Sequence, residues 1–357
     1  MKKFLTRLLL FTLLPSLPIM VAEGFLLPLN FFTYRPFEAL LFTTPVPHRE
    51  AFYPNRTISM TEQGDLGYRT RAAVNKYTDW HTDALGLRND QYLPRPDILI
   101  IGDSYISGGG LRQQETLTNQ LAARLGGRQS VYNLAPANFE NFEILLQEGL
   151  LQKPRLIIFS IVERDIPGVF RPAGDPHPVF RKLKTGLKNL FYTRDLHAQL
   201  DRCTRFYSLA WLSSRLSGQT GTGVPSPLDP SLLFLQGSST PVFTARESAL
   251  ALQAIESYKR FCDSLHVEFM FLPMPNKETV YFDLVPLGSQ PTYLLTLDSL
   301  LQAAGIRSVN TLGIYNQARR KDQRLLYQPD DTHWNGRAVG LVADAILGQL
   351  SNSPGWK

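Results

Sequence analysis

From residue 97 onward, short apolar runs alternate with stretches whose apolar residues recur every three or four positions. The uninterrupted runs are typical of strands buried on both faces, and the periodic stretches are typical of helices that cover a sheet. Alternation of this kind predicts an α/β fold in which a parallel sheet carries helices on both faces, making three layers. The predicted strands lie within 97–104, 130–135, 155–162 and 267–274, and the predicted helices span 116–126, 141–152, 247–265, 292–305 and 336–350.

The N-terminus has a different pattern. Lys2, Lys3 and Arg7 precede an apolar run over 8–21, and this charge order is that of an export signal whose basic end stays in the cytoplasm. Together with the apolar residues on either side of the run, residues 1–27 hold about 20 apolar residues, enough to span a bilayer, and no clean small-x-small cleavage site follows. We therefore expect residues 1–27 to form an uncleaved signal anchor, a transmembrane helix in the inner (cell) membrane. The rest of the chain is then periplasmic or otherwise extracytoplasmic.

Changes in composition divide the remaining chain. Residues 28–95 begin with an irregular stretch rich in proline and aromatic residues and continue with short strands, which predicts a juxtamembrane and N-terminal extension. Residues 96–352 are expected to form the main domain. Within it, a stretch at about 171–244 contains a segment rich in Gly, Ser and Pro and breaks the alternation, which indicates an insertion over one end of the sheet.

Composition and charge exclude some classes of function. The 357 residues are 43% hydrophobic and 19% charged, which is ordinary for a globular protein. The net charge of +6 comes without a long Lys/Arg run, so we expect no nucleic-acid partner. The two cysteines, Cys203 and Cys262, leave a disulfide open, but C-x-x-C spacing is missing, and we expect neither a metal site nor a cofactor.

One hydroxyl stands where a doubly wound sheet binds its ligands. Ser104 follows the predicted strand at 98–102, and ligands of such sheets lie outside the carboxyl ends of the strands. Near the other end of the chain, Asp330, Asp331 and His333 crowd into four residues directly before the last predicted helix. A nucleophilic serine requires a base that takes its proton and a carboxylate that orients the base. The alternative is that Ser104 and the two aspartates only cap helices, which leaves His333 unexplained.

These residues resemble the motifs of the SGNH/GDSL hydrolases, and the likeness runs over 97–350. The Gly-Asp-Ser at 102–104 matches the first block of that family, and Asp330 and His333 match the Asp-x-x-His of its last block. The resemblance implies a three-layer, flavodoxin-like fold. It also implies a Ser-His-Asp triad with Ser104 as the nucleophile and His333 as the base.

The middle blocks of the family supply the expected oxyanion donors. In the second block, Ala137 stands where the family has a glycine that donates its backbone N–H, and in the third block Arg164 stands where the family has an asparagine. The resemblance implies the backbone N–H groups of Ser104 and Ala137 as donors. Arg164 either donates to the oxyanion or to an anionic saccharide, or it forms a salt bridge with Glu163 or Asp165.

Three further segments, IVERDI, FLPMPNKETVY and DTHWN, resemble the SGNH-like domains of the alginate O-acetylation proteins of the AlgX/AlgJ type. That resemblance implies transfer of acetyl groups from an acyl donor to polysaccharide hydroxyls, with a membrane-bound O-acyltransferase as partner. The Asp-x-His-Trp of this group assigns the orienting carboxylate to Asp331, whereas the broader family spacing assigns it to Asp330. Both assignments stay open.

Trp334, Lys277 and Tyr281 are the candidates for contact with the polysaccharide. An indole face matches that of a pyranose ring, and Lys277 and Tyr281 follow a strand end, although all three also fit a structural role. The predicted function is therefore an SGNH-type serine O-acetyltransferase acting on cell-envelope or exopolysaccharide. Two alternatives remain: a secreted GDSL-type carbohydrate esterase, and a degenerate SGNH domain that binds polysaccharide without turnover.

Overall fold

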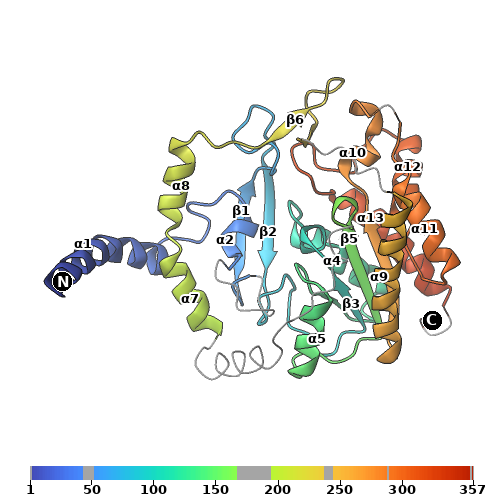
Figure 1. Cartoon of the computed structure of the whole chain (residues 1–357), viewed down its shortest axis with the longest axis horizontal. Coiled ribbons are helices and arrows are strands. Elements are labelled where there is room, and N and C mark those ends of the chain that lie inside the picture. Colours follow the sequence, from blue (N-terminus) through green and yellow to red (C-terminus); the bar gives the residue numbers. More distant parts are fainter. Residues whose placement is uncertain are drawn as a thin grey trace.

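A parallel sheet of four strands forms the centre of the protein, with the strand order β4-β3-β5-β8 (Figure 1). The computed structural model describes residues 2–42, 52–166, 194–236, 244–287, 289–353 and 356. Nearly every strand residue is buried, because helices cover both faces. The strands are β3 (Ile98–Ile101), β4 (Val131–Asn133), β5 (Leu156–Val162) and β8 (Glu268–Met274).

The two helical layers follow from a reversal of the chain across the sheet. The chain steps from β3 to β4 through α4 (Leu117–Leu125) and then passes back over β3 to β5 through α5 (Phe139–Gln147). Right-handed crossovers that run in opposite directions lie on opposite faces of a sheet. The reversal also makes the carboxyl end of β3 the point where ligands bind in such folds.

Each layer is closed by helices from the C-terminal half. On one face, α4 packs against α13 (Gly336–Ser351), and α13 packs against α12 (Thr311–Lys321). On the other, α9 (Ala245–Ser264) meets α5 where Tyr258 stacks on Phe139, and α11 (Tyr293–Ala303) packs beside α9. The predicted α/β architecture is confirmed, although α12 was not among the expected helices.

The N-terminal extension builds a second, smaller core. Its antiparallel strands β1 (Thr57–Glu62) and β2 (Lys76–His81) pack beside α2 (Pro36–Leu40). Trp80 is fully buried at the centre of this core, against the edges of Phe37 and Phe52.

The chain begins with α1 (Lys2–Val21) and the π-helical turn η1 (Ala22–Leu26), and α1 projects from the body of the molecule (Figure 1). Within the described ranges, no helix combines the length and the apolar character needed to cross a membrane. The expected membrane anchor at 1–27 is therefore not supported by the structure.

Part of the predicted insertion at 171–244 packs on the segment that directly precedes the N-terminal extension. Here α7 (Arg194–Thr204) contacts η1, and the Glu23 carboxylate accepts hydrogen bonds from the first two N–H groups of α8 (Tyr207–Leu216). The hairpin of β6 (Gly223–Pro225) and β7 (Leu233–Leu235) lies at the carboxyl end of the sheet, where the Leu233 N–H donates to the Pro329 carbonyl. Residues 171–193 and 237–243 of this stretch lie outside the described residues.

Cys203 of α7 and Cys262 of α9 are both free thiols, so the disulfide left open by the sequence is not formed.

Short helical turns complete the carboxyl end of the sheet. The turns are α3 (Ser104–Ser107), η2 (Gln113–Glu115), η3 (Glu163–Asp165), α10 (Lys277–Val280) and η4 (Phe282–Leu284).

Candidate active site

Ser104 stands on the turn that leaves β3, and its neighbour caps the following helix. The Asp103 carboxylate accepts the Tyr105 N–H at 2.8 Å and the Val162 N–H at 3.2 Å, which ties the end of β3 to the end of β5. A side chain on Gly102 would place its Cβ 2.5 Å from Cγ1 of Ile106, so the turn requires glycine here. Because Asp103 does the capping, the Ser104 hydroxyl is available for other contacts.

A chain of two hydrogen bonds joins Ser104, His333 and Asp331. The Ser104 Oγ lies 2.8 Å from Nε2 of His333, and Nδ1 of His333 lies 2.6 Å from Oδ1 of Asp331. The same Asp331 oxygen also accepts the backbone N–H of His333 at 2.9 Å, which fixes the two residues relative to each other. With Nδ1 protonated toward Asp331, Nε2 is left to accept the serine proton.

The neighbouring Asp330 makes a different set of contacts. Its side chain is fully buried, and its Oδ2 accepts the N–H groups of Gly64 and Val74, each at 2.8 Å. Asn335 caps α13 by accepting the Ala338 N–H, so neither aspartate caps that helix. Of the two carboxylates that the sequence left open, Asp331 contacts the histidine and Asp330 fastens the loop to the N-terminal extension.

Asp65 belongs to this site, although the sequence analysis did not single it out. Its carboxylate accepts the backbone N–H of Thr332 at 3.0 Å and the Thr332 hydroxyl at 2.8 Å. Its own N–H donates to Oδ2 of Asp331 at 3.2 Å. The only sequence signal was the pair of flanking glycines, because a Cβ on Gly64 or Gly67 would lie within 3 Å of atoms of Asp330.

The charges around the histidine favour its protonated form. Burial alone would lower the pKa of His333, but the Asp331 carboxylate outweighs burial and holds this pKa above its usual value of 6.5. Burial alone would raise the pKa of Asp331, but His333 and the Lys76 ammonium hold it well below 3.8. The Lys76 Nζ lies 3.5 Å from Oδ2 of Asp331. The site thus stabilises the imidazolium that forms when serine gives up its proton.

The three expected oxyanion donors differ in whether the protein already occupies their N–H groups. The Ser104 N–H has no acceptor among the described residues. The Ala137 N–H donates to the Gly102 carbonyl at 2.8 Å, which corrects its assignment as a donor to the oxyanion. Arg164 stands at the end of β5, with Nη1 3.4 Å from Oδ1 of Asn276 and Nε 4.0 Å from Asp165. It remains partly exposed.

The three residues predicted to bind substrate are buried, which corrects that assignment. The Trp334 side chain has no exposed surface, and its Nε1–H donates to the Tyr105 carbonyl. The Tyr281 hydroxyl accepts the Leu326 N–H inside the core. Lys277 is 1% exposed, and burial lowers its pKa to about 8. Its Nζ donates to the carbonyls of Leu233, Gln328, Pro329 and Asp331.

One group in the described part of the chain has the composition of a cation site. Atoms of Asp65, Asp331 and His333 lie within 4.8 Å of one another. However, Nδ1 of His333 is bound to Asp331, and both oxygens of Asp65 are bound to Thr332. The arrangement therefore fits proton transfer better than metal binding.

No protein-family model matches the chain, and no curated protein matches it either. Two solved structures are among those with a distant likeness to the chain. A proposed acylhydrolase from Bacteroides fragilis has 9% sequence identity and a TM-score of 0.34, over 72% of this chain and 86% of that one. An acetyl xylan esterase from Butyrivibrio proteoclasticus has 9% identity and a TM-score of 0.31, over 80% of this chain and 68% of that one.

Proposed function

We propose that the protein is a serine enzyme that transfers O-acyl groups to or from the hydroxyl groups of a polysaccharide. The observation that carries the proposal is the continuous contact from Ser104 through His333 to Asp331, at 2.8 Å and 2.6 Å. A degenerate domain that only binds polysaccharide does not require this alignment of serine, histidine and aspartate. Asp331 precedes His333 by two residues, which matches the Asp-x-His-Trp order of the acetyltransferase-like group and supports that group over the broader spacing.

In the proposed reaction, the Ser104 Oγ attacks the acyl carbonyl while Nε2 of His333 takes the hydroxyl proton. Asp331 stabilises the imidazolium, and the Ser104 N–H together with Arg164 faces the oxyanion. The tetrahedral intermediate then expels the donor alcohol, which receives its proton from His333. This leaves an ester on Ser104.

A second hydroxyl group, of a sugar or of water, completes the proposed cycle. His333 takes the proton of this acceptor as its oxygen attacks the ester carbonyl. The tetrahedral intermediate then expels the Ser104 oxygen, which receives that proton from His333, so the acyl group leaves on the acceptor and the Ser104 hydroxyl is restored. A sugar hydroxyl as acceptor makes the protein an O-acetyltransferase, and water as acceptor makes it a carbohydrate esterase. We propose the transferase, with a membrane-bound O-acyltransferase as the source of the acyl group, on the strength of the IVERDI, FLPMPNKETVY and DTHWN resemblances.

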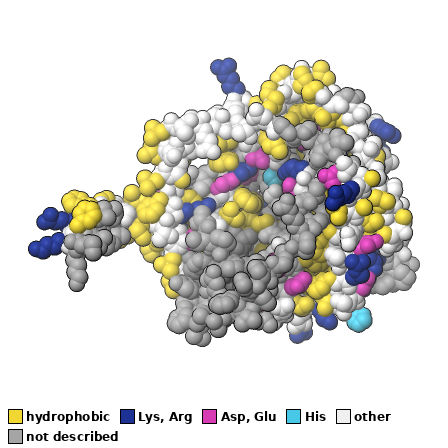
Figure 2. Space-filling view, viewed as in Figure 1, with side chains coloured by type: hydrophobic (Ala, Val, Ile, Leu, Met, Phe, Trp, Pro, Cys, Tyr) yellow, Lys and Arg dark blue, Asp and Glu magenta, His cyan; other side chains and the backbone are white. Residues whose placement is uncertain are grey.

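The proposed location is the extracytoplasmic face of the cell membrane. The basic residues ahead of the apolar run in α1 support export. Exposed leucines on α7 and α8 support contact of this part with lipid: Leu196, Leu200, Leu209, Leu212 and Leu216. Figure 2 shows apolar side chains along this edge of the molecule and on α1.

The test compares the wild type with Ser104→Ala on p-nitrophenyl acetate, with and without an oligosaccharide acceptor. Acetyl-oligosaccharide formation indicates the transferase, and nitrophenol release with acetate alone indicates the esterase. We expect Ser104→Ala to lose turnover while its melting temperature stays near the wild-type value, because the change deletes one hydroxyl at a turn. Turnover by Ser104→Ala at the wild-type rate excludes this nucleophile.

A further inference from the structure

A pocket of about 530 Å³ lies between the N-terminal extension and α8. One wall comes from residues 32–34 and 65–69, and the other comes from α8 and the loop that follows it to Thr222. Asp65 lines this pocket and also holds Thr332, so the pocket adjoins the loop that carries the catalytic histidine. Its volume is that of a small-molecule site. Figure 2 shows acidic and basic side chains gathered in a hollowed part of the surface between α8 and α10.

Aromatic rings form much of the pocket. Trp211 of α8 is 36% exposed and packs at 5.9 Å between ring centres on Phe32. Across the pocket, Tyr34 stacks on Tyr68 with ring centres 3.7 Å apart. A sugar ring has C–H groups on its faces and hydroxyls at its rim, so it packs on an aromatic face while its hydroxyls reach polar groups.

The loop after α8 supplies polar groups for such a rim. The side chains of Gln219, Thr220 and Thr222 line the pocket and make no hydrogen bond to other described residues. Hydroxyl and amide groups both donate and accept, as sugar hydroxyls do. Each of these side chains therefore has its hydrogen-bonding capacity available to a ligand.

The formal charges that line the pocket cancel, because the two arginines Arg69 and Arg205 face two carboxylates, those of Glu38 and Asp65. Nη1 of Arg69 donates to the Ser214 hydroxyl at 3.0 Å, and Nη2 of Arg205 donates to the Glu38 carbonyl at 2.9 Å. The Glu38 carboxylate pairs with Arg35. Because the lining holds as many carboxylates as guanidinium groups, the pocket has no net formal charge and favours a neutral ligand over an anionic one.

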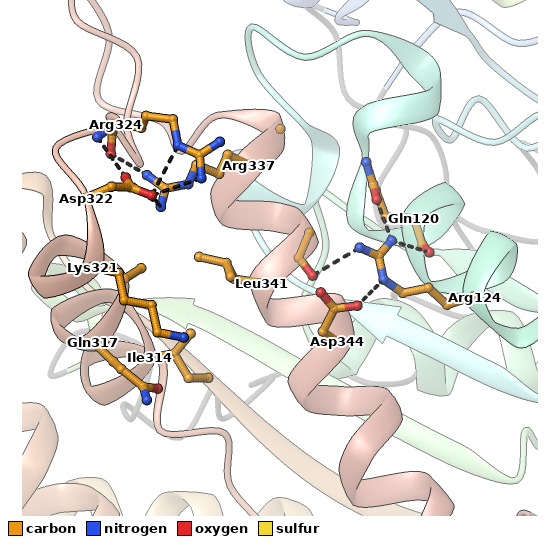
Figure 3. A pocket seen from close by; sticks show the side chains of 13 residues that line it. Gln120, Arg124, Ile314, Gln317, Lys321, Asp322, Arg324, Arg337, Leu341 and Asp344 are labelled. Carbon is orange, nitrogen blue, oxygen red and sulfur yellow. Dashed lines mark hydrogen bonds and ion pairs between the residues drawn. The ribbon is translucent and has the colours of Figure 1, made fainter.

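A second hollow differs in this respect. It has about 450 Å³ and lies between α4, α12 and α13 (Figure 3). Nε of Arg124 lies 2.6 Å from Asp344, and Nη2 of Arg337 lies 3.0 Å from Asp322. Its lining is dominated by these ion pairs, and it offers no exposed aromatic face for a sugar.

We propose that the pocket between the N-terminal extension and α8 binds a neutral sugar ring of the polysaccharide, stacked on Trp211 and hydrogen-bonded by the loop 219–222. The inference rests on the proposed function, because it names the substrate class for the same site. It also assigns a role to two parts of the chain outside the parallel sheet. A neutral glycan, rather than a uronate polymer, is then the substrate.

The kinetic test measures kcat/KM for O-acetylated cellotetraose and for p-nitrophenyl acetate in the full chain. For Trp211→Ala we expect kcat/KM for acetylated cellotetraose, divided by kcat/KM for p-nitrophenyl acetate, to fall about tenfold. Loss of one aromatic contact predicts a change of this size. Trp211→Phe keeps a ring and should retain most of the ratio. Ser213→Ala, an exposed change on the same helix outside the pocket, should leave the ratio unchanged. An unchanged ratio in Trp211→Ala overturns the proposal.

A binding test works without turnover. Trp80 and Trp334 are fully buried and Trp356 is 7% exposed, so a fluorescence change on adding sugar reports mainly on Trp211. We expect cellotetraose to change the fluorescence of Ser104→Ala in a saturable way, and Trp211→Phe in the same background to abolish the change. A saturable change with tetramannuronate and none with cellotetraose overturns the neutral class.

The two tests separate the two proposals. If the wild type turns over neither ester, the proposed reaction is wrong, and the titration still decides whether the pocket binds sugar. If the esters are turned over and cellotetraose gives no fluorescence change, the reaction stands and the pocket assignment is wrong.

Discussion

The Asp65 carboxylate accepts two hydrogen bonds from Thr332, one from its backbone N–H at 3.0 Å and one from its hydroxyl at 2.8 Å. The two residues are 267 positions apart in the sequence. Thr332 separates Asp331 from His333, so this contact sets the path of the short loop on which the base and its carboxylate lie. The N-terminal extension therefore completes the candidate active site as well as covering it.

Replacement of Asp65 should slow the enzyme without removing its nucleophile. Asp65→Ala deletes both hydrogen bonds to Thr332, and a displacement of His333 by about 1 Å costs roughly 100-fold in turnover. Asp65→Asn keeps one acceptor and one donor for the two Thr332 groups, so we expect it to recover most of the lost kcat. Steady-state kinetics on p-nitrophenyl acetate measures both. Equal rates for wild type and Asp65→Ala contradict the positioning role.

Sequence patterns were sufficient for the sheet and for the two ends of the proposed proton path. The strands were predictable because strands buried on both faces are uninterrupted apolar runs. Ser104 and His333 were singled out because each stands where its proposed chemistry requires a neighbour of a given type, and the structure places Oγ of Ser104 2.8 Å from Nε2 of His333. Asp65 was not found, because it lies on an irregular loop and its role depends on a long-range contact.

Residue spacing did not reveal which way side chains face. Trp334 follows the predicted base in sequence and Lys277 follows the end of β8, but both side chains are buried, and the Lys277 Nζ lies within hydrogen-bond distance of four carbonyl oxygens. Ala137 matched a family position, yet its N–H is used by the Gly102 carbonyl. Such orientations are set by tertiary hydrogen bonds, which a spacing pattern does not contain.

The two neighbouring aspartates should give opposite phenotypes. Asp331→Asn removes the charge that stabilises the imidazolium and disturbs the tautomer of His333, so we expect a loss in kcat on the ~10⁴-fold scale. Asp330→Asn weakens the attachment of Gly64 and Val74, and we expect a loss of about 1–3 kcal/mol in unfolding free energy with kcat within about tenfold of wild type. Kinetics and thermal melts on both variants check this. The reverse pattern would reassign the orienting carboxylate.

The pH dependence of the reaction should follow His333. The base must be neutral to take the serine proton, and Asp331 holds the pKa of His333 above 6.5. The rate constant kcat/KM should therefore rise with pH, with a midpoint above 6.5. In Asp331→Asn the stabilising charge is absent, so the midpoint of the residual activity should move to lower pH. A midpoint that is the same in both proteins contradicts control by this pair.

Stability has the opposite dependence on pH in this range. Because the pKa of His333 is raised on folding, its contribution to stability is fully present below about 6.5 and is lost as pH rises through the folded-state pKa. The depressed pKa of Asp331 adds stability that is present above 3.8 and is lost as pH falls through its folded-state pKa. Melting curves of wild type and His333→Ala across this range measure the difference.

The exposed leucines of α8 predict contact with a membrane surface. Leu209, Leu212 and Leu216 are 51%, 46% and 80% exposed and recur at helical spacing, so they form one apolar face of α8. Burying such a face in the interfacial region contributes roughly 25 cal/mol per Å². We expect the full-length chain to sediment with membranes and to be protected from protease added to the cytoplasmic side. Replacing the three leucines by serine should release more protein in a high-salt wash, while Leu250→Ser, an exposed change on α9, should not. Recovery of the wild type in the cytoplasmic fraction would contradict both the surface and the compartment.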